Sequence, residues 1–81
     1  MKYAREVMEL MAGFPGRDFR RVDIVRYLIG AKPDPRRRKR VEEAVRQVLK
    51  SLTESGAVEV TPAQGNGSFA LYRWKNHQMS L

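Results

Sequence analysis

The chain has 81 residues and no cysteine, so disulfide bonds, thiolate zinc sites and a thiol nucleophile are all excluded. This absence fits a protein of the reducing cytoplasm, where we expect the chain to act. Its one histidine, His77, has no second histidine with which to hold a metal or to share a proton. The glycine-rich phosphate motifs GxxxxGKS/T and GxGxxG are also missing. We therefore expect no catalysis, no metal and no cofactor.

Long apolar runs are absent as well. No stretch approaches the roughly 20 residues of a membrane-spanning helix. Charges at Lys2, Arg5 and Glu9 interrupt the N-terminal stretch that a signal peptide would need. The apolar fraction of 42% is nonetheless ordinary for a folded protein. The length suits one domain, which we expect over residues 1–75, followed by a flexible tail over 76–81.

Positive charge is what the chain has in excess, with a formal net charge of +7. The excess is confined to residues 17–50, where twelve Lys and Arg stand against five Asp and Glu. The bases and acids of the remaining residues cancel. A localised positive field points to a polyanionic partner, and the alternative is a solvated basic face that only aids solubility.

Helical spacing marks the first part of the chain. Tyr3, Val7, Leu10 and Phe14 follow one another at steps of 4, 3 and 4. This spacing places them on one stripe and predicts an amphipathic helix over residues 3–14.

A second, shorter helix is predicted over residues 20–29, because its apolar side chains share one face. They are Val22, Val25, Leu28 and Ile29. Gly30 suits the position just after a helix end. Before this helix, Asp18 and Phe19 are suited to a short extended piece with Phe19 facing inward.

The longest predicted helix runs from residue 35 to about Ser55. Asp34 accepts hydrogen bonds from free backbone N–H groups, and Pro35 loses no needed donor at the first helical position. Gly56 is placed to end the helix as a left-handed cap. The apolar stripe of this helix is Val41, Val45, Val48 and Leu52.

Beyond Gly56 the apolar period changes from 3.6 to 2 residues. Residues 57–61 and 68–74 alternate, and a Gly/Asn cluster at 62–67 joins them, which predicts an antiparallel hairpin. The side chains expected to face the core are Val58, Val60, Phe69 and Leu71. Tyr72 and Trp74 then lie on the other strand face.

The predicted order is three helices followed by a two-stranded hairpin, an α+β fold with room for a short third strand at Asp18 and Phe19. Together with the capped third helix and the Gly-rich hairpin loop, this order resembles the winged helix-turn-helix superfamily of DNA-binding domains over residues 3–75. The resemblance implies that the second and third helices form the helix-turn-helix. It also implies that the third helix enters the major groove and that the hairpin loop, or wing, reaches the backbone or minor groove.

The surface of the third helix opposite its apolar stripe is mainly cationic and is centred on Lys50. Its other members are Arg36, Lys39, Glu43, Arg46 and Gln47, with Arg40 at the margin. Arg and Lys pair with phosphates or with guanine, and Gln47 suits an adenine edge. For Glu43 two uses are open: it accepts from a cytosine amino group, or it pairs with Lys39 or Gln47 on the same helix.

Five consecutive cations, Arg36 to Arg40, stand at the N-terminus of this helix. They repel one another and oppose the helix macrodipole, so a docked phosphate would relieve a local conflict. Capture by Asp34, Glu42 or Glu43 is the alternative without a ligand.

Candidate contacts also lie outside the third helix, at the start of the second helix, in the hairpin loop and on the return strand. The segment 62–68 holds no Lys or Arg, so Arg73 is expected to supply its cation. The complete candidate set for DNA contact is Arg20, Arg21, Arg36, Arg37, Lys39, Arg40, Glu43, Arg46, Gln47, Lys50, Gln64, Asn66 and Arg73.

These features predict sequence-specific binding of double-stranded DNA by a small prokaryotic, phage or plasmid transcriptional regulator. We expect a homodimer, because one helix reads only a few base pairs and paired half-sites increase specificity. Two alternatives stay open: a winged-helix protein interaction module in a larger assembly, and binding to structured RNA through the basic helix. No small-molecule effector and no membrane partner are expected.

Overall fold

Helices and short strands alternate along the first part of the fold, and a hairpin completes it. The computed structural model describes residues 2–31, 34–65 and 67–75. Its elements are α1 (Ala4–Ala12), β1 (Asp18–Phe19), α2 (Arg21–Ile29), α3 (Pro35–Ser55), β2 (Val58–Thr61) and β3 (Leu71–Trp74). An α+β fold of three helices and a three-stranded antiparallel sheet is thus confirmed within these residues, including the short strand before α2. The expected tail over 76–81 lies outside them.

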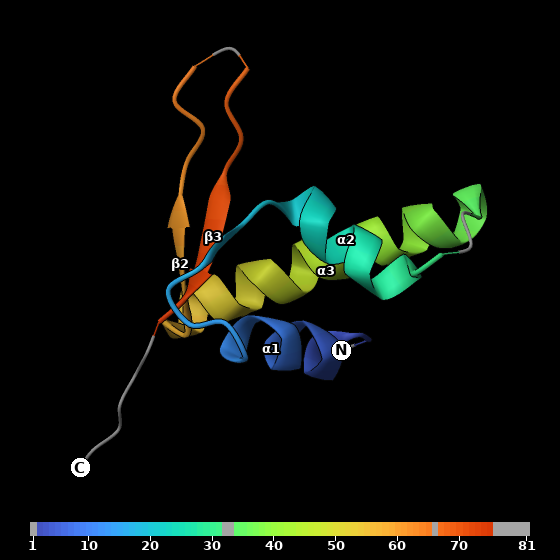
Figure 1. Ribbon diagram of the computed structural model, residues 1–81, viewed down its shortest axis with the longest axis horizontal. Helices are drawn as coiled ribbons and strands as arrows, with labels where there is room; N and C mark the ends of the chain where they lie inside the picture. Colours follow the sequence, from blue (N-terminus) through green and yellow to red (C-terminus); the bar gives the residue numbers. More distant parts are fainter. Residues whose placement is uncertain (1, 32–33, 66, 76–81) are drawn as a thin grey trace.

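The strands pair in the order β1-β3-β2, so β3 lies in the centre of the sheet. Arg73 of β3 is opposite Asp18 of β1 on one side and Glu59 of β2 on the other. Figure 1 shows β2 and β3 beside the C-terminal end of α3, with their connecting loop projecting away from the helices. On the other side of α3 from that loop lies α1 (Figure 1).

The predicted start and end of the long helix are both confirmed. The Asp34 carboxylate accepts a hydrogen bond from the Arg36 backbone N–H at 3.0 Å, and Pro35 takes the first helical position. Gly56 follows the last turn with a φ of 87°, the left-handed conformation that glycine adopts without steric cost. Two sharp ends therefore define α3, which holds most of the candidate DNA contacts.

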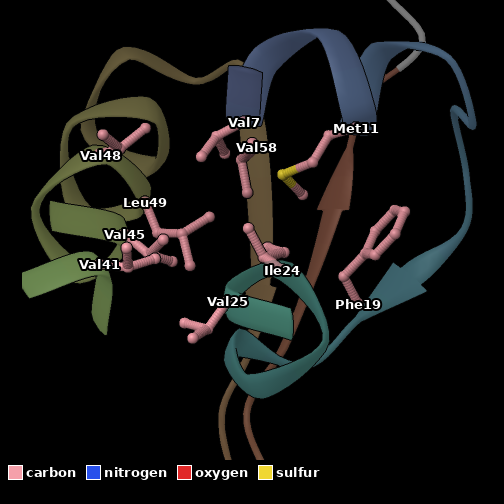
Figure 2. Close-up of a cluster of buried hydrophobic side chains, with 10 residues drawn as sticks. All are labelled: Val7, Met11, Phe19, Ile24, Val25, Val41, Val45, Val48, Leu49 and Val58. Carbon is pink, nitrogen blue, oxygen red and sulfur yellow. The ribbon is translucent and has the colours of Figure 1, made fainter. Parts of the chain in front are cut away.

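The hydrophobic core lies between the three helices and one face of the sheet (Figure 2). Its buried members are Val7, Met11, Phe19, Ile24, Val25, Val41, Val45, Val48, Leu49 and Val58. Burying one such side chain contributes about 1.5–3 kcal/mol relative to leaving it in water. The apolar stripe predicted for α3 is confirmed, with Leu52 partly buried and Leu49 added to it.

The first helix is shorter than predicted, since α1 ends at Ala12 and not at residue 14. Phe14 lies in the following turn with half of its surface exposed, and Met11 takes the buried place expected for it. The residue before a proline is disfavoured in helical geometry, so Pro15 keeps Phe14 out of the helix.

The second helix runs over Arg21–Ile29, close to its predicted range, but its most buried side chains are Ile24 and Val25. Both point into the side-chain cluster in Figure 2. Val22, which the spacing placed on the core face, is only partly buried. The core face of α2 is therefore rotated toward Ile24.

The prediction of the hairpin's inward face is confirmed for Val58, which is buried, and was wrong for the second strand. Phe69 is 59% exposed and precedes β3, which begins at Leu71 and not at residue 68. Tyr72 and Trp74 instead pack against the core. The register explains this, because Trp74 lies opposite Val58, and directly opposed residues of an antiparallel pair share a face.

Candidate nucleic-acid interface

A hollow of about 550 Å³ lies where the start of α2, one side of α3 and the beginning of β3 meet. It is lined by Arg20, Arg21, Val22, Val25, Lys39, Glu42, Glu43, Arg46, Phe69, Ala70 and Tyr72. We call this feature the α2–α3 hollow. It brings together five residues of the predicted contact set, which are Arg20, Arg21, Lys39, Glu43 and Arg46.

Arg20 is held at the rim of the hollow by contacts on two sides. Its guanidinium forms hydrogen bonds with both carboxylate oxygens of Asp23, at 3.0 and 3.3 Å. The same group lies over the ring of Phe69, 5.3 Å from its centre. The Arg20 side chain thus connects the start of α2 to the base of the hairpin loop.

Asp23 also organises the backbone at the start of α2. Its carboxylate accepts a hydrogen bond from the Arg20 backbone N–H at 3.1 Å, as the third residue of a capping box does. The Arg20 side chain, and then its backbone N–H, lower the pKa of Asp23 because both stabilise the ionised carboxylate. The charge of Arg20 is in turn largely offset by Asp23.

Glu43 is engaged within its own helix. It accepts from Arg46 Nη2 at 2.5 Å and from Gln47 Nε2 at 3.4 Å. The hydrogen bond from Arg46 is the main reason that the pKa of Glu43 is lowered. Of the helical partners expected for Glu43, Gln47 is confirmed, while the cation beside it is Arg46 and not Lys39.

The cation run at the start of α3 is only partly neutralised. Arg38 pairs with Glu42 at 3.0 Å, as one of the ligand-free alternatives foresaw. Across the part of the chain that the structure describes, five other α3 cations are exposed and form no ion pair. They are Arg36, Arg37, Lys39, Arg40 and Lys50. Uncompensated charge therefore gathers on the solvent side of α3.

The hairpin supplies less to this surface than predicted. Gln64 is exposed in the projecting loop, and Asn66 lies outside the described residues. Arg73 approaches Asp18 at 3.6 Å and Glu59 at 3.9 Å, in the row where these three residues oppose one another. Because side chains alternate along a strand, Arg73 lies on the sheet face opposite Tyr72, which lines the hollow.

The aromatic part of the hollow was missed at the level of sequence. Phe69 and Tyr72 line it, together with Ala70 and Glu42. The alternating pattern of residues 68–74 is compatible with either face inward, so it did not reveal that Phe69 is exposed beside a cluster of arginines. No signal in the sequence distinguishes the two faces, because the register between the strands is not fixed by the alternating pattern.

Comparison with known proteins adds no family to these observations: no family model, no curated protein and no solved structure matches the chain. None of the helices described is long and apolar enough to cross a membrane. Over the same described ranges, no three His, Asp or Glu side chains gather where they would hold a metal ion.

Proposed function

We propose that this chain is a winged-helix domain that binds double-stranded DNA, with α3 in the major groove, and acts as a small transcriptional regulator. The carrying observation is that five α3 cations are exposed on its solvent side and form no ion pair within the described part of the chain. The α2–α3 hollow beside them adds Arg21, which also forms no ion pair among the described residues. Such a surface suits a polyanion.

The dimensions of α3 agree with this proposal. The helix has 21 residues and, at 1.5 Å per residue, is about 30 Å long. The major groove of B-form DNA is about 12 Å wide and admits an α-helix. The order of elements and the projecting hairpin further support a winged-helix reading.

The test is binding of labelled duplex DNA by the double variant Lys39→Ala/Lys50→Ala, followed by fluorescence anisotropy. Both lysines are exposed and unpaired within the described chain, so we expect a loss of affinity of at least tenfold with an unchanged melting temperature. The control is Lys2→Ala/Arg5→Ala, which removes the same formal charge just before α1 and in its first turn. Arg5 approaches Glu9 at 3.7 Å, and α1 lies on the other side of α3 from the hairpin loop (Figure 1).

Two results would overturn the proposal. One is that the wild-type protein binds no duplex DNA at low salt. The other is that both double variants lose affinity equally, because that would show only a general response to net charge. Tighter binding to structured RNA than to DNA would favour the RNA alternative, although the deep, narrow major groove of A-form RNA does not admit α3.

We also propose that two copies of the chain bind paired half-sites, since a single α3 reads only a few base pairs. Selection of bound sequences from a random duplex pool tests this. Enrichment of a palindrome, with half-sites about 10 base pairs apart or a multiple of that, is the expected result. Enrichment of one short, unpaired site would contradict a dimer while leaving DNA reading intact.

A further inference from the structure

The α2–α3 hollow has apolar and aromatic lining residues that contact with an intact duplex does not require. Five of its lining side chains are apolar or aromatic, namely Val22, Val25, Phe69, Ala70 and Tyr72, and of these Val25 is buried while Phe69 is 59% exposed. Volumes of about 300–1,000 Å³ are typical of pockets for small ligands, and this one has about 550 Å³. A phosphate backbone needs cations alone, whereas this hollow also offers a flat aromatic ring.

Among the described residues, some of the charged side chains around the hollow form ion pairs within the protein, and others are free to attract a ligand. Arg20 is offset by Asp23, and Arg46 by Glu43, while Glu42 is offset by Arg38. Arg21 and Lys39 remain without an ion pair among the described residues, so they carry the net positive charge of the rim. The rim of the hollow therefore carries positive charge that is available to an anionic group of a ligand.

One face of the Phe69 ring is covered by the Arg20 guanidinium. Since more than half of the residue is exposed, the ring remains available to a stacking partner. The Arg20 guanidinium is a second flat group at the site. Guanidinium and aromatic planes both stack on nucleobases, so both groups favour a ligand with an aromatic ring.

A ligand with a flat aromatic body and one anionic group fits these features, and a nucleotide has both. Paired bases in a duplex present only their edges to the grooves, so the nucleotide must be unpaired. We propose that the α2–α3 hollow binds a single unpaired nucleotide of DNA, with its base against Phe69 and its phosphate near Arg21 and Lys39. This inference rests on the proposed function and extends it to duplexes that carry an unpaired or extruded base.

The experiment compares two labelled duplexes of about 20 base pairs, identical except that one carries a single unpaired adenosine. Stacking of a base on an aromatic side chain changes affinity by about tenfold. We therefore expect the wild-type protein to bind the duplex with the unpaired adenosine about tenfold more tightly. Phe69→Leu should abolish this preference, and Phe69→Tyr should retain it because the ring is kept.

Phe14→Leu is the matched control, since Phe14 is another exposed phenylalanine that lies beneath an arginine, Arg17, but is outside the hollow. This variant should keep the full preference. Thermal melting checks that each variant is folded, and the exposure of Phe69 makes a large loss of stability unexpected.

The outcomes separate this inference from the proposed function. Equal affinity of the wild-type protein for both duplexes would overturn the inference and leave duplex binding standing. A preference that survives in Phe69→Leu would overturn it as well. Saturable binding of free AMP without any preference between the duplexes would instead make the hollow an effector site. Failure to bind either duplex would overturn both proposals.

Discussion

Arg20, one of the residues predicted to contact DNA, is engaged within the protein itself. Asp23 binds its guanidinium on one side, and the ring of Phe69 lies against it on the other. A side chain fixed in this way positions its neighbours more than it attracts a distant phosphate. Lys39 and Arg21, which form no ion pair among the described residues, are better placed to supply charge to DNA.

Replacing Asp23 tests how much its hydrogen bonds with Arg20 stabilise the fold. Asp23→Ala loses the acceptor for the Arg20 backbone N–H and should lower the free energy of unfolding by about 1 kcal/mol at neutral pH, as loss of a helix cap does. Because the folded pKa of Asp23 is lowered, its contribution is present above the ordinary carboxyl pKa and is lost as pH falls through the lowered value. Urea denaturation at several pH values should show the difference from wild type shrinking below about pH 4. The control is Glu54→Ala, which removes an exposed carboxylate near the end of α3 and should change stability by less than about 0.5 kcal/mol at neutral pH.

Glu43 is the acidic member of the predicted DNA-contact set. Its carboxylate can pair with Arg46 or accept a hydrogen bond from a base, but the two uses compete. In the free protein it holds Arg46 and Gln47, two other candidate contacts. Its pairing therefore restrains two side chains of the proposed contact surface, and it also places a negative charge on that surface.

Glu43→Gln should raise affinity for duplex DNA of random sequence by about two- to fivefold at 0.1 M salt, because a like charge is removed and Arg46 is released. Anisotropy titration with a mixed-sequence duplex measures this, and Glu54→Gln serves as the charge-matched control. Weaker binding by Glu43→Gln would contradict this expectation and favour direct recognition of a cytosine by Glu43.

Among the elements, α3 was the most predictable from sequence because both of its ends carry residues with a specific backbone role. Asp34 and Pro35 start it, and Gly56 ends it with a φ that other residues rarely adopt. The apolar stripe between them is long enough to specify one face without ambiguity.

Gly56→Ala tests how strongly this end is required. A left-handed conformation costs a residue with a Cβ atom about 1–2 kcal/mol, so the variant should lose that much stability in urea denaturation. Ser51→Ala, at an exposed position within α3, should change stability by less than about 0.5 kcal/mol. Equal stability of Gly56→Ala and wild type would show that the end of α3 rearranges freely.

The hairpin was predictable as an element but not in its facing. Residues 68–74 alternate whichever face is buried, and a shift of one residue exchanges the two sets of side chains. The loop between the strands spans residues 62–70, longer than the turn cluster suggests, so the turn itself does not define the register. That register decides that Phe69 lines the α2–α3 hollow and that Arg73 lies outside it.

At the scale of the whole molecule, positive charge and apolar surface are separated by α3. Its apolar stripe packs into the core, while five of its cations are exposed to solvent and form no ion pair within the described residues. The middle of the chain carries the entire net charge of +7, so binding of a polyanion should be governed by one side of the fold.

Ionic strength tests this separation. If about six phosphates are neutralised, the logarithm of the binding constant should fall with the logarithm of salt concentration at a slope near −5. Lys39→Ala/Lys50→Ala should reduce the magnitude of the slope by about two, whereas Lys2→Ala/Arg5→Ala should leave it unchanged. A slope near zero would mean that the cations of α3 do not contact phosphates.

The shortness of β1 has a consequence for how the molecule opens. Two residues pair with β3, and α1 before them places only Val7 and Met11 fully in the core. The α1–β1 segment is held by fewer buried side chains than the rest of the fold, so we expect it to open before α2, α3 and the hairpin do. Amide hydrogens of this segment should exchange with solvent before those in the middle of α3, measured by native-state hydrogen exchange. A domain that opens first at its N-terminal end would keep the cationic surface of α2 and α3 assembled during that opening.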